Sequence, residues 1–350
     1  MQISDNWIDI AYLISAVLFV LGIKGLTKPK TAVRGNLLAA SGMGVACVVT
    51  LLHRDIVTYE IIIGGVIVGG IIGAILAKKV QMTAMPQLVA LLNGFGGGAS
   101  FAVAGAEFFR GGHPDTVGII ATGIAVLIGA VTLTGSFVAF AKLQELIDGK
   151  PMGFPGMKLV NAILLLGSVA AIAYLVMNPG VEPVFWGLAI AAAILGILLV
   201  SPIGGADMPV VIALLNSYSG VAAAAAGFAL GNLVLIVSGA LVGAAGLILT
   251  QIMTKAMNRS LVNVVFGTFG ATGSSGGGNG VVETRTAKDV SAEDVAVMLA
   301  YARSVIIVPG YGLAVAQAQH QVRELADLLE AQGVRVKYAI HPVAGRMPGH

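Results

Sequence analysis

Residues 232–254 read NLVLIVSGALVGAAGLILTQIMT, a continuous run without a charged side chain. A helix needs about 20 mostly apolar residues to cross the hydrocarbon core of a bilayer, so this run predicts a transmembrane helix. Comparable apolar runs precede it at about 7–26, 34–52, 57–77, 86–108, 116–140, 158–177, 184–201 and 208–229. The sequence therefore predicts a polytopic α-helical membrane domain of about nine transmembrane helices.

The composition of the whole chain supports this fold class. Of its 350 residues, 57% are hydrophobic and only 11% are charged, and the mean hydropathy is +0.92. Soluble domains carry about 25% charged residues, so an ordinary soluble protein is excluded. The single cysteine, Cys47, excludes a disulfide framework and a multi-cysteine metal site. We expect a lipid bilayer around the chain, no metal site and no nucleic-acid partner.

Basic residues are unevenly distributed among the loops. They follow the first, third, fifth and ninth predicted spans, whereas the alternate loops hold only Arg54 and Arg110. The basic set is Lys24, Lys28, Lys30, Arg34, Lys78, Lys79, Lys142, Lys150, Lys158, Lys255 and Arg259. Because basic loops stay on the cytoplasmic side, we expect the N-terminus outside and the C-terminal region in the cytoplasm.

The membrane domain contains an internal sequence repeat. Residues 85–95, MPQLVALLNGF, align without gaps on residues 208–218, MPVVIALLNSY. Both segments begin on the predicted cytoplasmic side, so the repeat is a parallel one that covers spans three to five and seven to nine. A chance likeness between two apolar helices is the alternative explanation.

The repeat places Asn93 and Asn216 at equivalent positions in their helices. Each amide lies about eight residues past its helix start, or roughly 12 Å into the membrane at 1.5 Å per residue. An amide at that depth must find hydrogen-bond partners. It either joins neighbouring helices or forms a polar station along an ion path.

Three further residues are candidates for a role in ion movement. Ser136 lies in the fifth predicted span, and Asn232 lies at the start of the last one. Asp207 is the acidic residue nearest to a membrane helix on the predicted cytoplasmic side. Its charge suits the N-terminus of the helix that follows, so helix capping alone would also explain it. The central parts of the spans contain no histidine, lysine or arginine, so an obvious proton carrier is missing there.

After the last span the sequence becomes more charged and contains no apolar run long enough to cross a bilayer. We predict a transmembrane domain over 1–258, a flexible linker over 259–290 and the N-terminal part of a nucleotide-binding domain over 291–350. In the third segment we expect a helix from Ser291 to about Tyr301, a strand over 304–308, a glycine turn over 309–312, a helix to about Gln332 and a strand over 334–340. Strand, glycine turn, helix and strand form a βαβ unit, which indicates an incomplete α/β Rossmann-like domain.

The glycine turn predicts a nucleotide site. Gly310 and Gly312 would let a dinucleotide pyrophosphate approach the backbone where the helix begins. Val315 replaces the third glycine of the usual fingerprint, and no acidic residue follows the second strand to hold a ribose hydroxyl. This pattern weakens an NAD site and leaves NADP open. Arg346 lies in a turn-rich loop, where it either meets a phosphate or is an ordinary surface arginine.

Four stretches resemble the β subunit of proton-translocating nicotinamide nucleotide transhydrogenase, and the likeness covers essentially the whole chain. They are residues 204–220, 255–260, 309–312 with 314–319, and 341–349. The resemblance implies a proton-translocating membrane domain joined to an NADP(H)-binding domain, with hydride transfer between NAD(H) and NADP(H) coupled to proton movement. NAD(H) would bind to a separate α subunit that carries further transmembrane helices. The complex would be a dimer in the bacterial cytoplasmic (inner) membrane.

The resemblance also implies roles for individual residues. Those expected to contact NADP(H) are Gly310, Tyr311, Gly312, Val315, Ala316, Val343, Ala344, Gly345, Arg346 and Met347. Asp207 would lie where the membrane and nucleotide domains communicate. Ser136 and Asn232 would belong to the proton region.

The chain departs from the family pattern at Asn93. Many members have a histidine at this position in the fourth span, and an asparagine amide cannot carry a proton at accessible pH. In members that lack the histidine, a helix of the partner subunit supplies one, so we expect a shared proton path. We also expect the nucleotide domain to continue beyond His350, because a doubly wound sheet needs more strands.

Two other functions agree with the residues alone. One is a secondary transporter or channel gated by a nucleotide-sensing domain, which would move a solute without needing a second nucleotide. The other is a membrane anchor for an enzyme complex, in which substitutions at Asp207 or Asn232 would leave coupling untouched.

Overall fold

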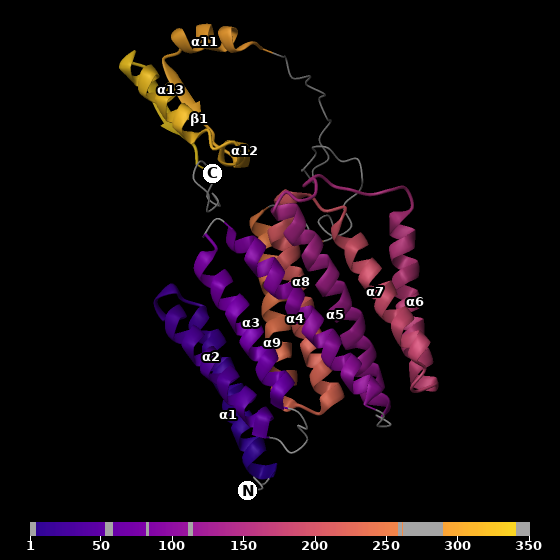
Figure 1. Ribbon diagram of the computed structural model, residues 1–350. Coiled ribbons are helices and arrows are strands. Elements are labelled where there is room, and N and C mark those ends of the chain that lie inside the picture. The colour runs from indigo at the N-terminus through magenta and orange to yellow at the C-terminus, as the bar shows by residue number, and fades with distance from the viewer. Residues whose placement is uncertain are drawn as a thin grey trace. The chain divides into compact units, whose positions relative to one another are not determined.

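The computed structural model describes residues 5–52, 59–81, 84–110, 115–257, 261 and 290–340 (Figure 1). The chain divides into two compact units, Met1–Ala271 and Thr272–His350. The division falls inside the predicted linker over 259–290, most of which lies outside the described residues. Each unit is described by itself below.

The described part of the first unit contains nine helices that are long and apolar enough to cross a membrane. They are α1 (Asp5–Leu26), α2 (Pro29–Leu52), α3 (Tyr59–Lys79), α4 (Met85–Phe109), α5 (Thr116–Leu143), α6 (Met157–Met177), α7 (Glu182–Val200), α8 (Met208–Leu230) and α9 (Leu233–Ala256). A single 3₁₀ turn, η2 (Gly205–Asp207), precedes α8. The predicted polytopic helical membrane domain of about nine spans is therefore confirmed.

The ends of some helices differ from the predicted spans. Helix α2 begins at Pro29, which is favoured in the first turn of a helix because its missing N–H has no partner there. Helix α5 continues to Leu143 and includes Lys142, which the sequence placed in a loop because of its charge. The side chain of Lys142 is buried, so its charge is satisfied inside the protein and not by water.

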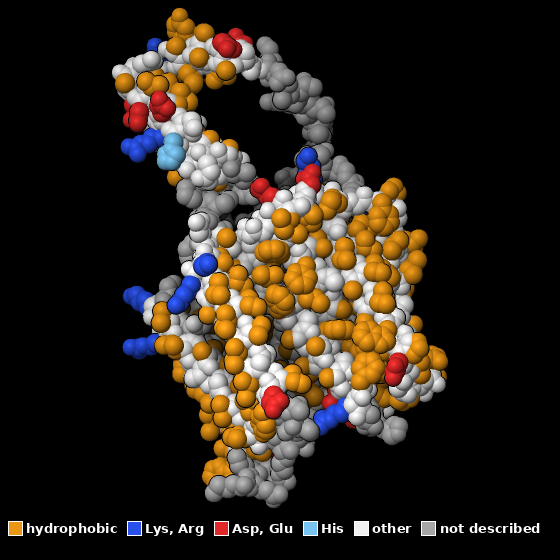
Figure 2. All heavy atoms as spheres, viewed as in Figure 1, with side chains coloured by type: hydrophobic (Ala, Val, Ile, Leu, Met, Phe, Trp, Pro, Cys, Tyr) orange, Lys and Arg blue, Asp and Glu red, His pale blue; other side chains and the backbone are white. Residues whose placement is uncertain are grey.

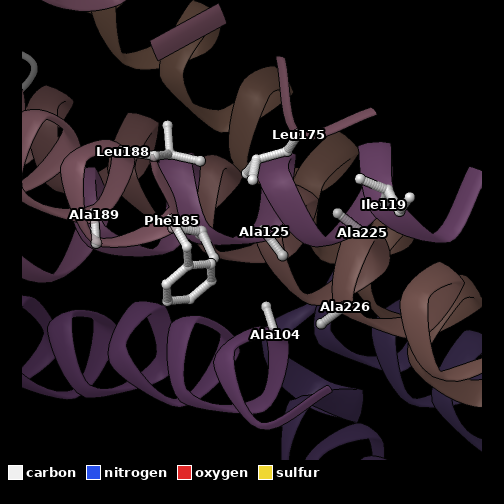
Figure 3. Packing of buried hydrophobic residues seen from close by; sticks show 10 residues of the cluster. Ala104, Ile119, Ala125, Leu175, Phe185, Leu188, Ala189, Ala225 and Ala226 are labelled. Atoms are coloured by element: carbon white, nitrogen blue, oxygen red, sulfur yellow. The ribbon is translucent and has the colours of Figure 1, made fainter. Parts of the chain in front are cut away.

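Helices α5 and α8 hold the bundle together. Helix α5 is the most buried of the nine and contacts α4, α6, α7 and α8, whereas α8 also contacts α4 and α9. Small side chains allow this close packing. Figure 3 shows the ring of Phe185 with Ala104 and Ala125 in one buried cluster, where Phe185 is 1% exposed. The Phe185 ring also stacks on Phe108, with the ring centroids 4.5 Å apart.

Helix α3 has a different environment, because none of its residues is buried by the described part of the chain. Ile61 and Val66 are 76% and 67% exposed, and the glycines of α3 have open space where a Cβ would lie. Figure 2 shows hydrophobic side chains over most of the visible face of the membrane unit. Exposing so many hydrophobic side chains to water would be strongly unfavourable, which agrees with an integral membrane protein.

The second unit contains α11 (Ala292–Ala300), β1 (Ser304–Ile307), α12 (Tyr311–Val315), α13 (Gln319–Ala331) and β2 (Arg335–Tyr338). The two strands are parallel neighbours, with Ser304 opposite Arg335 and Ile307 opposite Tyr338. Ser291 caps α11, because its hydroxyl accepts a hydrogen bond of 3.1 Å from the backbone N–H of Asp294. The predicted order of strand, turn, helix and strand is present.

One prediction for this unit is wrong, because the single helix expected between the strands is broken in two. Helix α12 ends at Val315, and α13 begins only at Gln319. Gln317 adopts a left-handed backbone with φ of 51°. The Gln317 side-chain amide donates a 2.7 Å hydrogen bond to the carbonyl of Ala314, and this bond holds the break locally. Because the described residues form a sheet of two short strands, the Rossmann-like assignment remains a proposal.

Candidate functional site

Asn93, Ser136 and Ser219 form a hydrogen-bonded cluster that joins three membrane helices. On α4, the Asn93 side-chain amide donates to the Ser136 hydroxyl of α5 over 3.0 Å. The Ser219 hydroxyl of α8 donates to the Asn93 Oδ1 atom over 2.7 Å. Asn93 is 8% exposed and Ser136 is fully buried. The structure thus brings together two of the predicted proton-path residues and adds Ser219, which sequence reasoning did not single out.

Glycines on α4 explain why these helices approach closely enough for the cluster to form. A Cβ on Gly94 would lie 3.1 Å from the Cβ of Ser136, and one on Gly97 would lie 2.8 Å from the Cβ of Thr132. The second distance is shorter than real Cβ contacts. Small residues are the usual means by which membrane helices approach, so these glycines set the separation of α4 and α5.

The equivalent position in the repeat is also a close helix crossing. Gly220, which corresponds to Gly97, lies against the backbone of Gly239 and Gly243 on α9. The Ser217 hydroxyl donates a 2.6 Å hydrogen bond to the Gly243 carbonyl across this crossing. Sequence reasoning missed this stripe of glycines on α9, although Gly239-x-x-x-Gly243 is the spacing that predicts a helix–helix contact.

Asn216 is not part of the cluster. It is half-buried on α8, one turn before Ser219. Among the residues that the structure describes, its side chain makes no hydrogen bond, unlike its repeat partner Asn93. An amide within the membrane needs a hydrogen-bond partner, so the partner of Asn216 would lie outside the described residues.

Asp207 lies in η2, directly before α8, as the sequence predicted. Within the described residues, its carboxylate makes no capping hydrogen bond to the first turn of α8. Asp207 nevertheless occupies the N-cap position of α8, where a negative charge suits the helix dipole. The segment before it is held by Lys142, which sequence reasoning counted only as a loop charge.

Lys142 connects the end of α5 to the segment that leads to Asp207. Its ammonium group donates hydrogen bonds to the backbone carbonyls of Lys150, Ser201 and Ile203, over 3.2, 2.5 and 2.8 Å. The side chain is 3% exposed. The Ser201 and Ile203 carbonyls follow the last turn of α7. Acceptors at such a position are left without an intrahelical donor, and a cation is favoured at a helix C-terminus.

Asn232 has a local structural role at the opposite end of α8. It is the N-cap residue of α9, and its Oδ1 atom accepts a 3.0 Å hydrogen bond from the backbone N–H of Leu235. The preceding Gly231 adopts φ of 66°, which allows α8 to end and α9 to begin without further loop residues. The structure does not bring Asn232 to the cluster around Asn93, and its place in a proton path stays a prediction.

The predicted nucleotide residues lie partly within the described chain. Gly310 is the N-cap residue of α12, with an extended backbone, and Gly312 lies inside this helix. A Cβ added at either glycine would meet no described atom within 4 Å. Packing against the described residues therefore does not require glycine there, whereas a close-approaching dinucleotide would. Ala316 follows as the C-cap residue, whereas Val343, Ala344, Gly345, Arg346 and Met347 lie outside the described residues.

Comparison with known proteins assigns the chain to a protein family. Residues 8–350 match the family described as NAD(P) transhydrogenase beta subunit. Two relatives named NAD(P) transhydrogenase subunit beta, both from Rhodospirillum rubrum, are 47% identical to this chain over 351 aligned positions. The alignment covers 97% of this chain and 75% of each relative. The chain therefore belongs to the family of NAD(P) transhydrogenase β subunits.

Proposed function

We propose that this chain translocates protons across the membrane and binds NADP(H) in its C-terminal unit, so that hydride transfer between NAD(H) and NADP(H) is coupled to proton movement. The observation that carries the proposal is the hydrogen-bonded cluster of Asn93, Ser136 and Ser219, which lies well inside the membrane unit. Polar side chains that face the interior of a membrane helix bundle often mark ion pathways.

Two of its members suit a proton path. A hydroxyl group both accepts and donates a hydrogen bond, so Ser136 and Ser219 can pass a proton along a chain that includes water. The Asn93 amide orients them but does not change its protonation state. The path then requires a titratable group, which the three residues of the cluster do not provide. A histidine on a transmembrane helix of an α subunit would supply it.

The surface of the membrane unit supports such a partner. The relatives are named as β subunits, which implies an α subunit in their complex. Here Asn216 has no hydrogen-bond partner in the described chain, and α3 exposes its residues along its whole length. We propose that transmembrane helices of an α subunit complete the proton path and that the same subunit binds NAD(H). The whole complex would be a dimer in the bacterial cytoplasmic (inner) membrane.

For NADP(H), the open space at Gly310 and Gly312 fits a dinucleotide backbone. Tyr311, Val315 and Ala316 would surround it, together with the segment over 343–347. When bound, the nicotinamide supplies the hydride chemistry. The residues of this chain would position the ring and exclude water, so no acid or base of this chain is needed for the transfer.

Coupling requires that proton movement changes the NADP(H) unit. We propose that Asp207, held in place through Lys142, transmits the state of the proton path to that unit on the cytoplasmic side. Moving one charge across 100 mV is worth about 2.3 kcal/mol, which shifts a two-state equilibrium about 50-fold. This energy suffices to favour either a state that exchanges nucleotide or a state that transfers hydride.

Proteoliposomes that contain the complete β chain, its α partner and a trapped pH dye test this proposal. We expect the reduction of an NAD analogue by NADPH to be accompanied by a dye response that an uncoupler abolishes. Hydride transfer with a silent dye would contradict proton translocation. If no hydride transfer occurs but a solute crosses the membrane, the gated transporter would be the better explanation.

A further inference from the structure

A cavity of about 590 Å³ lies between α5, α6, α7 and α8 in the membrane unit. Its walls are almost entirely aliphatic and include Leu127 of α5, Leu165 of α6, Leu199 of α7 and Leu214 of α8. The cavity extends from the middle of α5 to the end at which α6 begins, next to Met157. It is separate from the cluster around Asn93, none of whose residues line it.

The cavity exists because α6 packs loosely. Helix α6 is described throughout, and only Met157, Ser168 and Leu175 are buried in it. It contacts α7 and α5, but it has no close packing with α8, whose side chains form the opposite wall. Protein interiors are close-packed, so an apolar space of this size is expected to hold a molecule and not to stay empty.

Water does not suit this space. A buried water molecule needs two to four polar partners, and the lining offers few polar atoms. An α-helix of a partner is about 10 Å across with its side chains, so it would cover the opening without filling the interior. A flexible hydrocarbon chain fits an aliphatic cavity of several hundred cubic ångströms between helices.

Two polar side chains stand at one end of the cavity, both on the first turns of α6. Lys158 is the second residue of α6, and Asn161 lies one turn further along the helix. The Oδ1 atom of Asn161 is buried, and among the described residues it has no hydrogen-bond partner. The oxygen and nitrogen of an amide exchange places by a rotation of the side chain, so this buried end can present either a donor or an acceptor.

We propose that the cavity binds one phospholipid of the leaflet in which α6 begins, which the proposed orientation makes the cytoplasmic leaflet. One acyl chain lies along the aliphatic walls. An ester carbonyl accepts a hydrogen bond from the Asn161 amide, and the phosphate lies beside the Lys158 ammonium. A basic residue at the cytoplasmic mouth of a gap between helices favours an anionic headgroup, so phosphatidylglycerol is the preferred ligand.

Photolabelling in nanodiscs tests the site. The full-length subunit, together with its α partner, is placed in phosphatidylcholine that contains a small fraction of phosphatidylglycerol with a diazirine in one acyl chain. We expect labelling to concentrate on the cavity walls of α6 and α8. Unlabelled phosphatidylglycerol should compete at least fivefold better than phosphatidylcholine. This competition uses the unaltered protein, so it does not depend on how any variant folds.

Substitutions locate the two parts of the ligand. Ala162 lines the cavity, and Ala162→Phe fills it, so labelling there should fall at least fivefold. Leu166→Phe is the matched control, because Leu166 is 68% exposed on the same helix and does not line the cavity. Lys158→Gln should weaken the preference for phosphatidylglycerol at least threefold, whereas Lys158→Arg and the surface control Lys79→Gln should preserve it.

Three results would overturn the proposal. The first is labelling spread evenly over all lipid-exposed positions, which would indicate ordinary annular lipid. The second is unchanged labelling of the cavity in a folded Ala162→Phe variant. The third is a cross-link from the α6 cavity wall to the partner subunit in place of lipid, which would show that a protein segment occupies the space.

Discussion

The ammonium group of Lys142, in the last turn of α5, donates a 2.8 Å hydrogen bond to the carbonyl of Ile203, four residues before Asp207. The same group also bonds to the carbonyl of Ser201. A single side chain therefore fixes the position of the segment between α7 and α8 relative to α5. Any movement of residues 201–203 relative to α5 must break or stretch these bonds.

The first prediction concerns this lysine. Lys142→Met should lower the free energy of unfolding of the membrane unit by about 2 kcal/mol, because buried carbonyls lose a charged donor. It should also lower the number of protons moved for each hydride transferred. Thermal unfolding and the proteoliposome assay measure the two effects. Lys150→Gln is the control, because that side chain is 84% exposed, and its effect on stability should stay within about 0.5 kcal/mol. Unchanged stability and coupling in Lys142→Met would refute the role of this contact.

The second prediction concerns the polar cluster. Ser136→Ala and Asn93→Ala should each slow proton movement, and in a double-mutant cycle their effects on stability should be non-additive by about 0.6 kcal/mol. Ser168→Ala is the matched control. Ser168 is equally buried, but among the described residues its hydroxyl bonds only to the Leu164 carbonyl of its own helix. Equal effects of Ser136→Ala and Ser168→Ala on the dye response would show that the cluster is only structural.

The third prediction tests the spacing of α4 and α5. Gly97→Ala should destabilise the bundle by about 1–3 kcal/mol, because the added methyl group would overlap the side chain of Thr132. The two helices would move apart and weaken the bond between Asn93 and Ser136. The neighbouring Gly96→Ala is the control, because a Cβ there meets no described atom within 4 Å. We expect a lower thermal unfolding midpoint for Gly97→Ala than for Gly96→Ala. Equal midpoints would contradict the prediction.

The fourth prediction separates binding from folding in the C-terminal unit. Gly312→Ala should leave the stability of the nucleotide-free protein nearly unchanged but weaken NADPH binding about tenfold, because the methyl group occupies space meant for the ligand. Gly333→Ala should instead lower the stability of the nucleotide-free protein and leave NADPH binding nearly unchanged. Gly333 has φ of 82°, so alanine there costs about 1 kcal/mol of stability without approaching the nucleotide. Fluorescence titration with NADPH gives the affinities. Full affinity in Gly312→Ala would argue against a nucleotide at this turn.

The sequence predicted the number and approximate positions of the membrane helices, because length and apolarity are local properties. It could not predict which helices face one another. Asn93 and Ser136 were each singled out, but Ser219 became a partner only when the structure placed α8 against α4. The same limit applies to Asn216, whose repeat position is equivalent to that of Asn93 but whose surroundings are not.

Two local features were also beyond sequence reasoning. A lysine near a helix end is usually solvated, so only the fold shows that Lys142 turns inward to the carbonyls of a distant loop. The break between α12 and α13 contains neither glycine nor proline, and residues 314–319 have good helix formers. The left-handed backbone at Gln317 overrides that local preference. The residue types in this segment do not predict this backbone conformation.

The short connection between α8 and α9 bears on how the protein is made. Only Gly231 and Asn232 separate the two helices, and glycine backbones along both helices are in contact. If α8 entered the bilayer alone, its glycine-lined face would be exposed to lipid, and α9 would have to reverse direction immediately. We expect the two helices to leave the insertion machinery together as one hairpin.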